Sequence, residues 1–195
     1  RDLAGVRHRW AGCGAVRKSA FLDVGGFDVE VYKVPSIEDI ELGYRIKDAG
    51  GRIVLEPELL GKHLKVWKPG NSIFTDIFRR ALPWSRLMIA SGPILDDLNT
   101  SKAERVKAAV AGLFLLSILL LPFVSGVWMW TLLLAVLALA LNWRFAKFLF
   151  DNGGLLFAAG SLLYHQFYYI YSASAFAWCL FEYHVLGIKD RLHVP

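Results

Sequence analysis

Two neighbouring carboxylates, Glu38 and Asp39, stand where side chains could take part in chemistry. Pro35, shortly before them, lacks an N–H and restricts the residue that precedes it, which predicts a helix beginning just after the proline. Ser36 and Asp39 have the spacing of a capping box, and both acids then lie at the positive end of the helix dipole. Gly43, one turn beyond Asp39 on the same face, leaves room beside that carboxylate for a bound hydroxyl compound. Acids in a first helical turn can also do no more than cap the helix.

The helix that carries these acids has an apolar side and a glycine end. Ile37, Ile40 and Tyr44 recur at three- and four-residue spacing, which predicts one buried stripe. The glycines at 50–51 predict the end of the helix, and the apolar run at 52–55 predicts a buried strand after it.

A run of small residues at 12–15 lets the backbone approach a neighbour or a ligand closely. The segment 17–22 predicts a short helix that ends at the glycine pair 25–26. Small residues can also serve only for packing, so both roles stay open for Gly12 and Gly14.

The segment 38–46 resembles a motif of a known family. Its sequence Glu-Asp-Ile-Glu-Leu-Gly-Tyr-Arg-Ile, with Gly-Gly-Phe-Asp at 25–28 and the glycines at 50–51, is similar to the acceptor half of family 2 glycosyltransferases. The resemblance covers roughly residues 5–90. It implies the second half of an α/β domain of the GT-A (Rossmann-like) type.

The resemblance also implies roles for single residues. Asp39 would be the general base that takes a proton from the acceptor hydroxyl, and Glu38 would help to position that acceptor. Gly12 and Gly14 would lie beside the donor and acceptor pocket. The implied reaction is transfer of a sugar from a nucleotide-activated donor to a hydroxyl, with inversion at the anomeric carbon.

A second resemblance lies in the basic and aromatic stretch 62–92. Its segment 78–84, Phe-Arg-Arg-Ala-Leu-Pro-Trp, is similar to the Gln-x-x-Arg-Trp element of membrane polysaccharide synthases, although the Gln is absent and three residues separate Arg80 from Trp84. The resemblance implies that Trp84 lines the acceptor site and that Arg79 and Arg80 face the donor diphosphate. Trp84 can instead be an anchor at a membrane interface.

His63 is a candidate metal ligand, again by resemblance. In some family 2 enzymes a histidine at a similar place binds the divalent cation, Mg²⁺ or Mn²⁺, together with an Asp-X-Asp motif. This sequence has no such motif, so most ligands of the cation are expected in sequence before Arg1. A surface histidine among Lys62 and Lys65 is the alternative.

Charge and hydropathy divide the 195 residues unevenly. Residues 1–107 hold 18 of the 22 Lys and Arg residues and 14 of the 17 Asp and Glu residues, whereas residues 108–142 carry no charge. With 55% hydrophobic residues and a mean hydropathy of +0.42, the chain is too apolar for an ordinary soluble domain.

Three regions are predicted from this division. They are the acceptor-side half of a catalytic domain at 1–61, basic amphipathic interfacial helices at 62–107, and a membrane region at 108–195 with spans at about 108–124, 127–142 and 154–180. Basic residues flank the first two spans at their outer ends only, which predicts a hairpin whose two ends are cytoplasmic. The basic helices favour anionic lipids, and nucleic acid is not an expected partner because base-binding sites do not normally continue into membrane spans.

The cysteines, Cys13 and Cys179, stand far apart, which favours a reducing compartment.

The predicted function is that of the C-terminal portion of an inverting, hexosyltransferase-like membrane glycosyltransferase. Its acceptor would be lipid-linked or membrane-associated, as in polysaccharide or glycolipid synthesis. The expected location is a bacterial inner (plasma) membrane, with the catalytic part in the cytoplasm. Because the chain begins with Arg1 and not with Met, a donor-binding part is expected before it, and the chain alone is expected to be inactive. The alternative is a non-catalytic membrane anchor or assembly subunit whose acidic helix start is only a cap.

Overall fold

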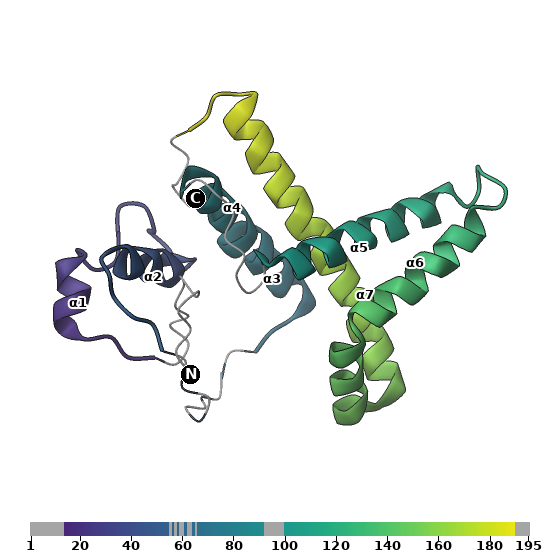
Figure 1. The fold of residues 1–195 in the computed structure, drawn as a ribbon, viewed down its shortest axis with the longest axis horizontal. Coiled ribbons are helices and arrows are strands. Elements are labelled where there is room, and N and C mark those ends of the chain that lie inside the picture. Colours follow the sequence, from purple (N-terminus) through teal and green to yellow (C-terminus); the bar gives the residue numbers. More distant parts are fainter. Residues whose placement is uncertain are drawn as a thin grey trace. The chain divides into compact units, whose positions relative to one another are not determined.

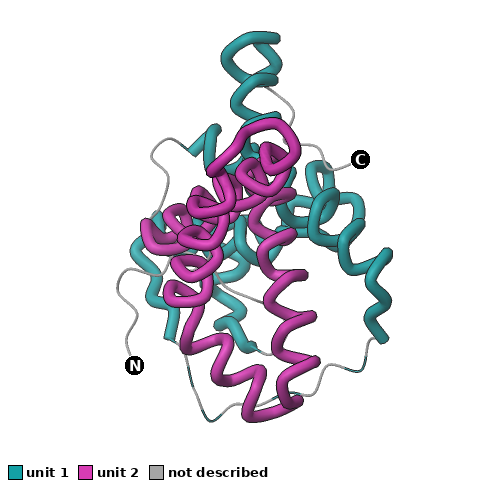
Figure 2. Tube along the Cα trace, turned by 90° about the vertical axis from the view of Figure 1, so that its right-hand side faces the viewer, with its two compact units in different colours: residues 1–98, 175–195 teal, residues 99–174 magenta. Residues whose placement is uncertain are grey.

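The computed structural model describes residues 14–54, 56, 58, 61, 64, 66–91 and 100–189, and the regular secondary structure within them is helical (Figure 1). In chain order the elements are α1 (Lys18–Asp23), α2 (Glu38–Asp48), α3 (Pro69–Phe74), the π-helix η1 (Thr75–Ala81), α4 (Leu82–Ser91), α5 (Lys102–Leu120), α6 (Val127–Leu141) and α7 (Trp143–His184). They belong to two compact units (Figure 2). Unit 1 is residues 1–98 with 175–195, and unit 2 is residues 99–174.

The prediction of an α/β, GT-A-like domain half is wrong for the described residues, which contain helices and no sheet. In the run at 52–55, Arg52 and Ile53 have no regular structure, Val54 is an isolated bridge residue, and Leu55 lies outside the described residues. A short apolar run becomes a strand only where a neighbouring strand pairs with it, and the described part of the chain supplies none. Apolar composition alone therefore did not specify backbone pairing here.

The prediction of about three transmembrane helices is also wrong for the described residues. No single helix among them combines the length and the apolar composition that crossing a membrane requires. α6 has 15 residues, or about 22 Å of helix, against a hydrocarbon core of about 30 Å. α5 has 19 residues, but charged side chains occupy its first two turns. Only α6 and α7 taken together meet the requirement, as a pair bent by 74°.

The buried stripe predicted on α2 is confirmed. Ile37 and Tyr44 are buried in one cluster with Leu87 of α4, and Ile40 and Trp84 pack against that cluster. The cluster joins two helices of unit 1 that are distant in the sequence. Burial of these side chains removes apolar surface from water, which is the main stabilising contribution available to such a contact.

The glycine end of α2 is confirmed as well. The N–H of Gly51 donates to the carbonyl of Ile46 at 2.8 Å, and the N–H of Gly50 donates to that of Lys47 at 3.0 Å. Gly50 has a φ of 82°, so the pair forms the Schellman arrangement that ends many helices. A Cβ on Gly51 would lie 2.6 Å from the Ile46 carbonyl oxygen, which explains why a residue without a side chain occupies position 51.

In unit 2, α5 and α6 form a hairpin around the turn at 121–126, where the sequence predicted a turn (Figure 1). Gly126, at the start of α6, has a φ of 82°. The long helix α7 loses helical geometry at Gly154, with φ 74° and ψ −174°, and so consists of two helical segments, 143–153 and 155–184.

A polar network joins the three helices of unit 2. The Tyr169 hydroxyl on α7 donates to Oε2 of Glu104 on α5 at 2.7 Å and lies 3.4 Å from Oδ1 of Asn142, which ends α6. Nε2 of His165 lies 3.1 Å from the same hydroxyl. Because Tyr169 and Asn142 are buried, these polar groups need one another as hydrogen-bond partners. The network therefore holds the first turn of α5 beside the last turn of α6.

Candidate functional site

The start of α2 is built differently from the predicted capping box. The N-cap residue is Ile37, whose side chain makes no capping hydrogen bond. The Ser36 hydroxyl instead donates to the backbone carbonyl of Arg79 at 2.6 Å, across 43 residues of sequence. The N–H of Ser36 donates to Oε2 of Glu38 at 2.6 Å, so this carboxylate folds back over the residues that precede the helix. The capping box is wrong because the serine hydroxyl has a partner outside the helix.

Asp39 is buried in the first turn of α2, with 8% of its surface exposed. Its Oδ1 accepts the N–H of Ile40 at 2.9 Å, which satisfies one of the free N–H groups at the helix start. Gly43 is buried one turn further along the same helix. The predicted general base is thus held by the helix that carries it, at the positive end of the helix dipole.

Pro83 explains why the Arg79 carbonyl is available to Ser36. In a regular helix the carbonyl of Arg79 would accept the N–H of the residue four positions later, and proline has no N–H. The turns before it are the π-helix η1, the kind of irregular helix often found where a proline or a function interrupts the regular hydrogen bonds. The freed carbonyl then accepts the Ser36 hydroxyl and ties η1 to the start of α2.

The residue after Pro83 makes a second connection between the same elements. Nε1 of Trp84 donates to the Tyr44 hydroxyl at 3.3 Å, and the indole packs on the buried cluster of α2 and α4. We call Ser36, Glu38, Asp39, Tyr44, the Arg79 carbonyl and Trp84 the α2–α4 site. The two segments that resemble glycosyltransferase motifs therefore meet in unit 1.

Arg45 connects α2 to the glycine turn at 25–26. Its guanidinium makes two hydrogen bonds to Glu41, at 2.6 and 2.7 Å, and donates to the carbonyl of Val24 and, at 2.6 Å, to that of Gly26. The hydrogen bonds to Glu41 raise the pKa of Arg45 above its ordinary value. One charged fork thus holds two backbone carbonyls and a carboxylate, a geometry that lysine cannot reproduce.

The turn held by Arg45 depends on its own residues. Gly25 and Gly26 have φ values of 83° and 70°, and a Cβ on Gly26 would lie 2.9 Å from the Phe21 ring. Phe21 packs edge-on against Phe27, with ring centroids 5.3 Å apart. Oδ1 of Asp28 then accepts the N–H groups of the second and third residues after it, at 3.1 and 3.0 Å. The Gly-Gly-Phe-Asp sequence therefore specifies a turn, which confirms that part of the prediction.

Tyr32 follows this turn and packs against the α2 cluster. Burial, with the neighbouring carboxylates of Glu41, Asp28 and Glu38, raises the pKa of the Tyr32 phenol well above its ordinary value. The phenol therefore keeps its proton, and it is an uncharged group among the acids on this side of α2.

The other predicted site residues lie elsewhere. Arg80 is exposed, pairs with Asp76 at 3.0 Å and lies 5.8 Å from the Trp67 ring, so its guanidinium is engaged away from α2. Gly14 is exposed before α1. Gly12 and His63 lie outside the described residues.

The predicted divalent cation has no set of ligands in the part of the chain that the structure describes. Among those residues, no three His, Cys, Asp or Glu side chains come together as a metal would require. The cation stays a prediction from resemblance.

The sequence reasoning missed Arg45 and Tyr32, and it assigned Ser36 to a capping box and not to its contact with Arg79. A signal was present for Arg45, because Glu41 precedes it by four residues and such pairs face each other on a helix. A signal was also present for the Arg79 carbonyl, since a proline inside a helical pattern always frees the carbonyl four residues earlier. The hydrogen bond from the Ser36 hydroxyl to the Arg79 carbonyl is long-range, and local sequence carries no sign of it.

No family model, no curated protein and no solved structure matches the chain. The α2–α4 site therefore has to be interpreted from its own geometry.

Arg45→Lys is expected to lower the free energy of unfolding by about 1–3 kcal/mol, because the lysine leaves carbonyls at the turn without their charged donor. Arg80→Lys is the matched control: it changes an exposed pair of the same spacing and is expected to cost about 0–1 kcal/mol. Denaturant unfolding of both variants beside the parent measures the difference. Equal losses of unfolding free energy in the two variants would show that the Arg45 guanidinium does not hold the turn at 25–26.

Proposed function

We propose that this chain provides the acceptor side of an inverting glycosyltransferase, with Asp39 as the general base. The observation that carries the proposal is the α2–α4 site. A buried carboxylate stands at the start of α2. The Arg79 carbonyl accepts the hydroxyl of Ser36, two residues before α2, and Trp84 donates to Tyr44 within α2.

The chemistry follows from the position of the carboxylate. Asp39 would accept the proton of the acceptor hydroxyl as its oxygen bonds to the anomeric carbon, while the bond from that carbon to the nucleoside diphosphate breaks on the opposite face. Such general-base help is typically worth about 10²–10⁴-fold in rate. Glu38 and Trp84 would orient the acceptor, the carboxylate by hydrogen bonds and the indole through its apolar face. A divalent cation, where bound, would supply positive charge to the leaving diphosphate.

We further propose that the acceptor is presented at a membrane surface. Trp67, Phe74 and Phe78 are exposed in unit 1, and the two phenylalanine rings lie 4.9 Å apart. The charged side chains of Lys68 and Arg80 are exposed beside them in the sequence. Exposed aromatics alternating with basic residues are typical of segments that lie in the headgroup region of anionic membranes. A lipid-linked acceptor at the cytoplasmic face of a plasma membrane suits this arrangement.

Asp39→Asn tests the chemical part of the proposal. Asparagine retains an oxygen that can accept the N–H of Ile40, so the free energy of unfolding is expected to fall by less than about 1 kcal/mol. The amide cannot take a proton from the acceptor, so kcat is expected to fall by about 10²-fold or more. The measurements are a sugar-transfer assay and a melting curve on the full-length protein.

Asp28→Asn is the control for the transfer assay, because it makes the same chemical change at a carboxylate that only bonds to its own turn. Its kcat is expected to stay within about threefold of the parent. An Asp39→Asn protein that folds normally and transfers sugar at the parent rate would remove Asp39 from the mechanism and favour the non-catalytic alternative.

A peptide of residues 66–91 tests the membrane part. It is expected to bind vesicles containing anionic lipid and to dissociate as salt rises, because each basic residue near the surface contributes about 1 kcal/mol. A control peptide with Phe74→Ser and Phe78→Ser should bind less at every salt concentration. Binding of the parent peptide that is the same for neutral and anionic vesicles would contradict the electrostatic contribution.

A further inference from the structure

The helix that carries Trp84 is held on two sides within unit 1. Trp84 and Leu87, three residues apart, lie on the side of α4 that packs with α2. Leu82 and Arg86, four residues apart, lie on another side and contact the last two turns of α7. The first contact belongs to the α2–α4 site, and the second joins α4 to the end of α7.

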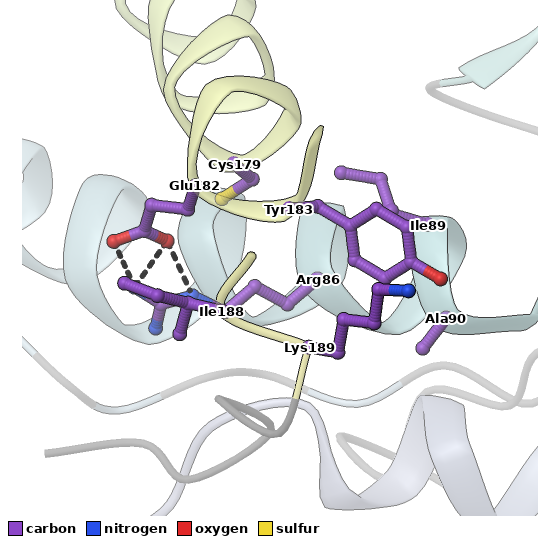
Figure 3. A pocket seen from close by; sticks show the side chains of 8 residues that line it. All are labelled: Arg86, Ile89, Ala90, Cys179, Glu182, Tyr183, Ile188 and Lys189. Atoms are coloured by element: carbon purple, nitrogen blue, oxygen red, sulfur yellow. Dashed lines mark hydrogen bonds and ion pairs between the residues drawn. The ribbon is translucent and has the colours of Figure 1, made fainter. Parts of the chain in front are cut away.

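The second contact is a buried ion pair. The Arg86 guanidinium donates three hydrogen bonds to the Glu182 carboxylate, at 3.1, 3.2 and 3.4 Å (Figure 3). Only 4% of the Glu182 side chain and 15% of the Arg86 side chain are exposed. The Cys179 thiol, one turn before Glu182, is buried and lies 3.7 Å from the carbonyl of Leu82. Removing one partner of such a pair leaves a buried charge uncompensated, so the pair strongly favours one arrangement of the two helices.

Glu182 also holds the residues that follow α7. Its backbone carbonyl accepts the N–H of Ile188 at 3.0 Å, after a turn in which Gly187 has a φ of 67°. Nζ of Lys189 then lies 5.7 Å from the Tyr183 ring. A small pocket is lined by Glu182, Tyr183, Ile188 and Lys189 together with Arg86 and the end of α4 (Figure 3). The end of α7 and the segment after it therefore form one support for α4.

We propose that Glu182 is a positioning residue for the acceptor-binding side of the α2–α4 site. Through Arg86 it fixes the rotation of α4, and that rotation decides where Trp84 stands relative to α2. The proposal rests on the proposed glycosyltransferase function. It adds that acceptor affinity depends on a residue that does not touch the acceptor.

The test uses the full-length protein and three variants: Glu182→Gln, Arg86→Gln, and the two combined. In each single variant the acceptor KM is expected to rise about fivefold or more, while kcat stays within about twofold. The double variant is expected to be no worse than the single ones, because both substitutions remove the same pair and leave no unpaired charge. Asp151→Asn is the control, since it breaks the exposed Lys147–Asp151 pair, which is 2.8 Å long, and should leave KM unchanged.

A second measurement does not depend on sugar transfer. This measurement uses the 195-residue chain with Cys13→Ser as the background, in which Cys179 is the one remaining cysteine. Its rate of reaction with a water-soluble maleimide reports whether α4 and the end of α7 separate. The rate is expected to increase at least about fivefold in Glu182→Gln and to stay the same in Asp151→Asn.

Faster labelling together with a raised KM supports the proposal. An unchanged labelling rate of Cys179 in Glu182→Gln would show that the ion pair does not hold α4 against α7, which overturns the proposal. Faster labelling with an unchanged KM would overturn the positioning role. A parent protein that labels slowly but transfers no sugar from any nucleotide-sugar donor overturns the proposed function, and the positioning role is lost with it. If the increases in KM of the two single variants add in the double variant, Glu182 does not act through its pair with Arg86, and the proposal is overturned.

Discussion

The architecture of unit 1 depends on a missing N–H group. Pro83 has no N–H to donate to the Arg79 carbonyl, and the turns before it form the π-helix η1. The Ser36 hydroxyl takes that place at 2.6 Å. Trp84, directly after the proline, bonds to Tyr44, so a second hydrogen bond joins the same two segments. A local defect in one helix thereby produces the long-range contact on which the candidate site depends.

The same helix explains how the site and the C-terminal residues are related. α4 presents Trp84 and Leu87 to α2, and presents Arg86 to Glu182 at the end of α7. The first contact is apolar with one hydrogen bond, and the second is a buried ion pair, which tolerates little rotation. The packing of Trp84 on α2 is therefore linked, through α4, to a residue 96 positions after Arg86.

The features that depend on neighbouring residues could be predicted from the sequence. The features that depend on contacts with distant residues could not. The stripe on α2, its glycine end and the turn at 25–28 all follow from spacing or from the φ values that glycine permits. The capping box failed because the Ser36 hydroxyl bonds to a carbonyl 43 residues away. The strand at 52–55 failed because the described residues provide no strand to pair with it, and the three spans failed because no single described helix combines the length and the apolar composition that crossing a membrane requires. The candidate base, Asp39, was found from its motif, whereas the contacts of Arg45 and the contact of Ser36 with Arg79 emerged only from the structure.

The configuration of the product tests the central claim most directly. If one carboxylate deprotonates the acceptor while the nucleotide leaves from the opposite face, the anomeric carbon undergoes a single displacement. The measurement is the proton NMR spectrum of the product made by the full-length protein from a nucleotide-sugar donor of known anomeric configuration. General-base catalysis by Asp39 in a single displacement predicts a product of the opposite configuration, a β-linked sugar from an α-linked donor. A product that retains the configuration of the donor would contradict it.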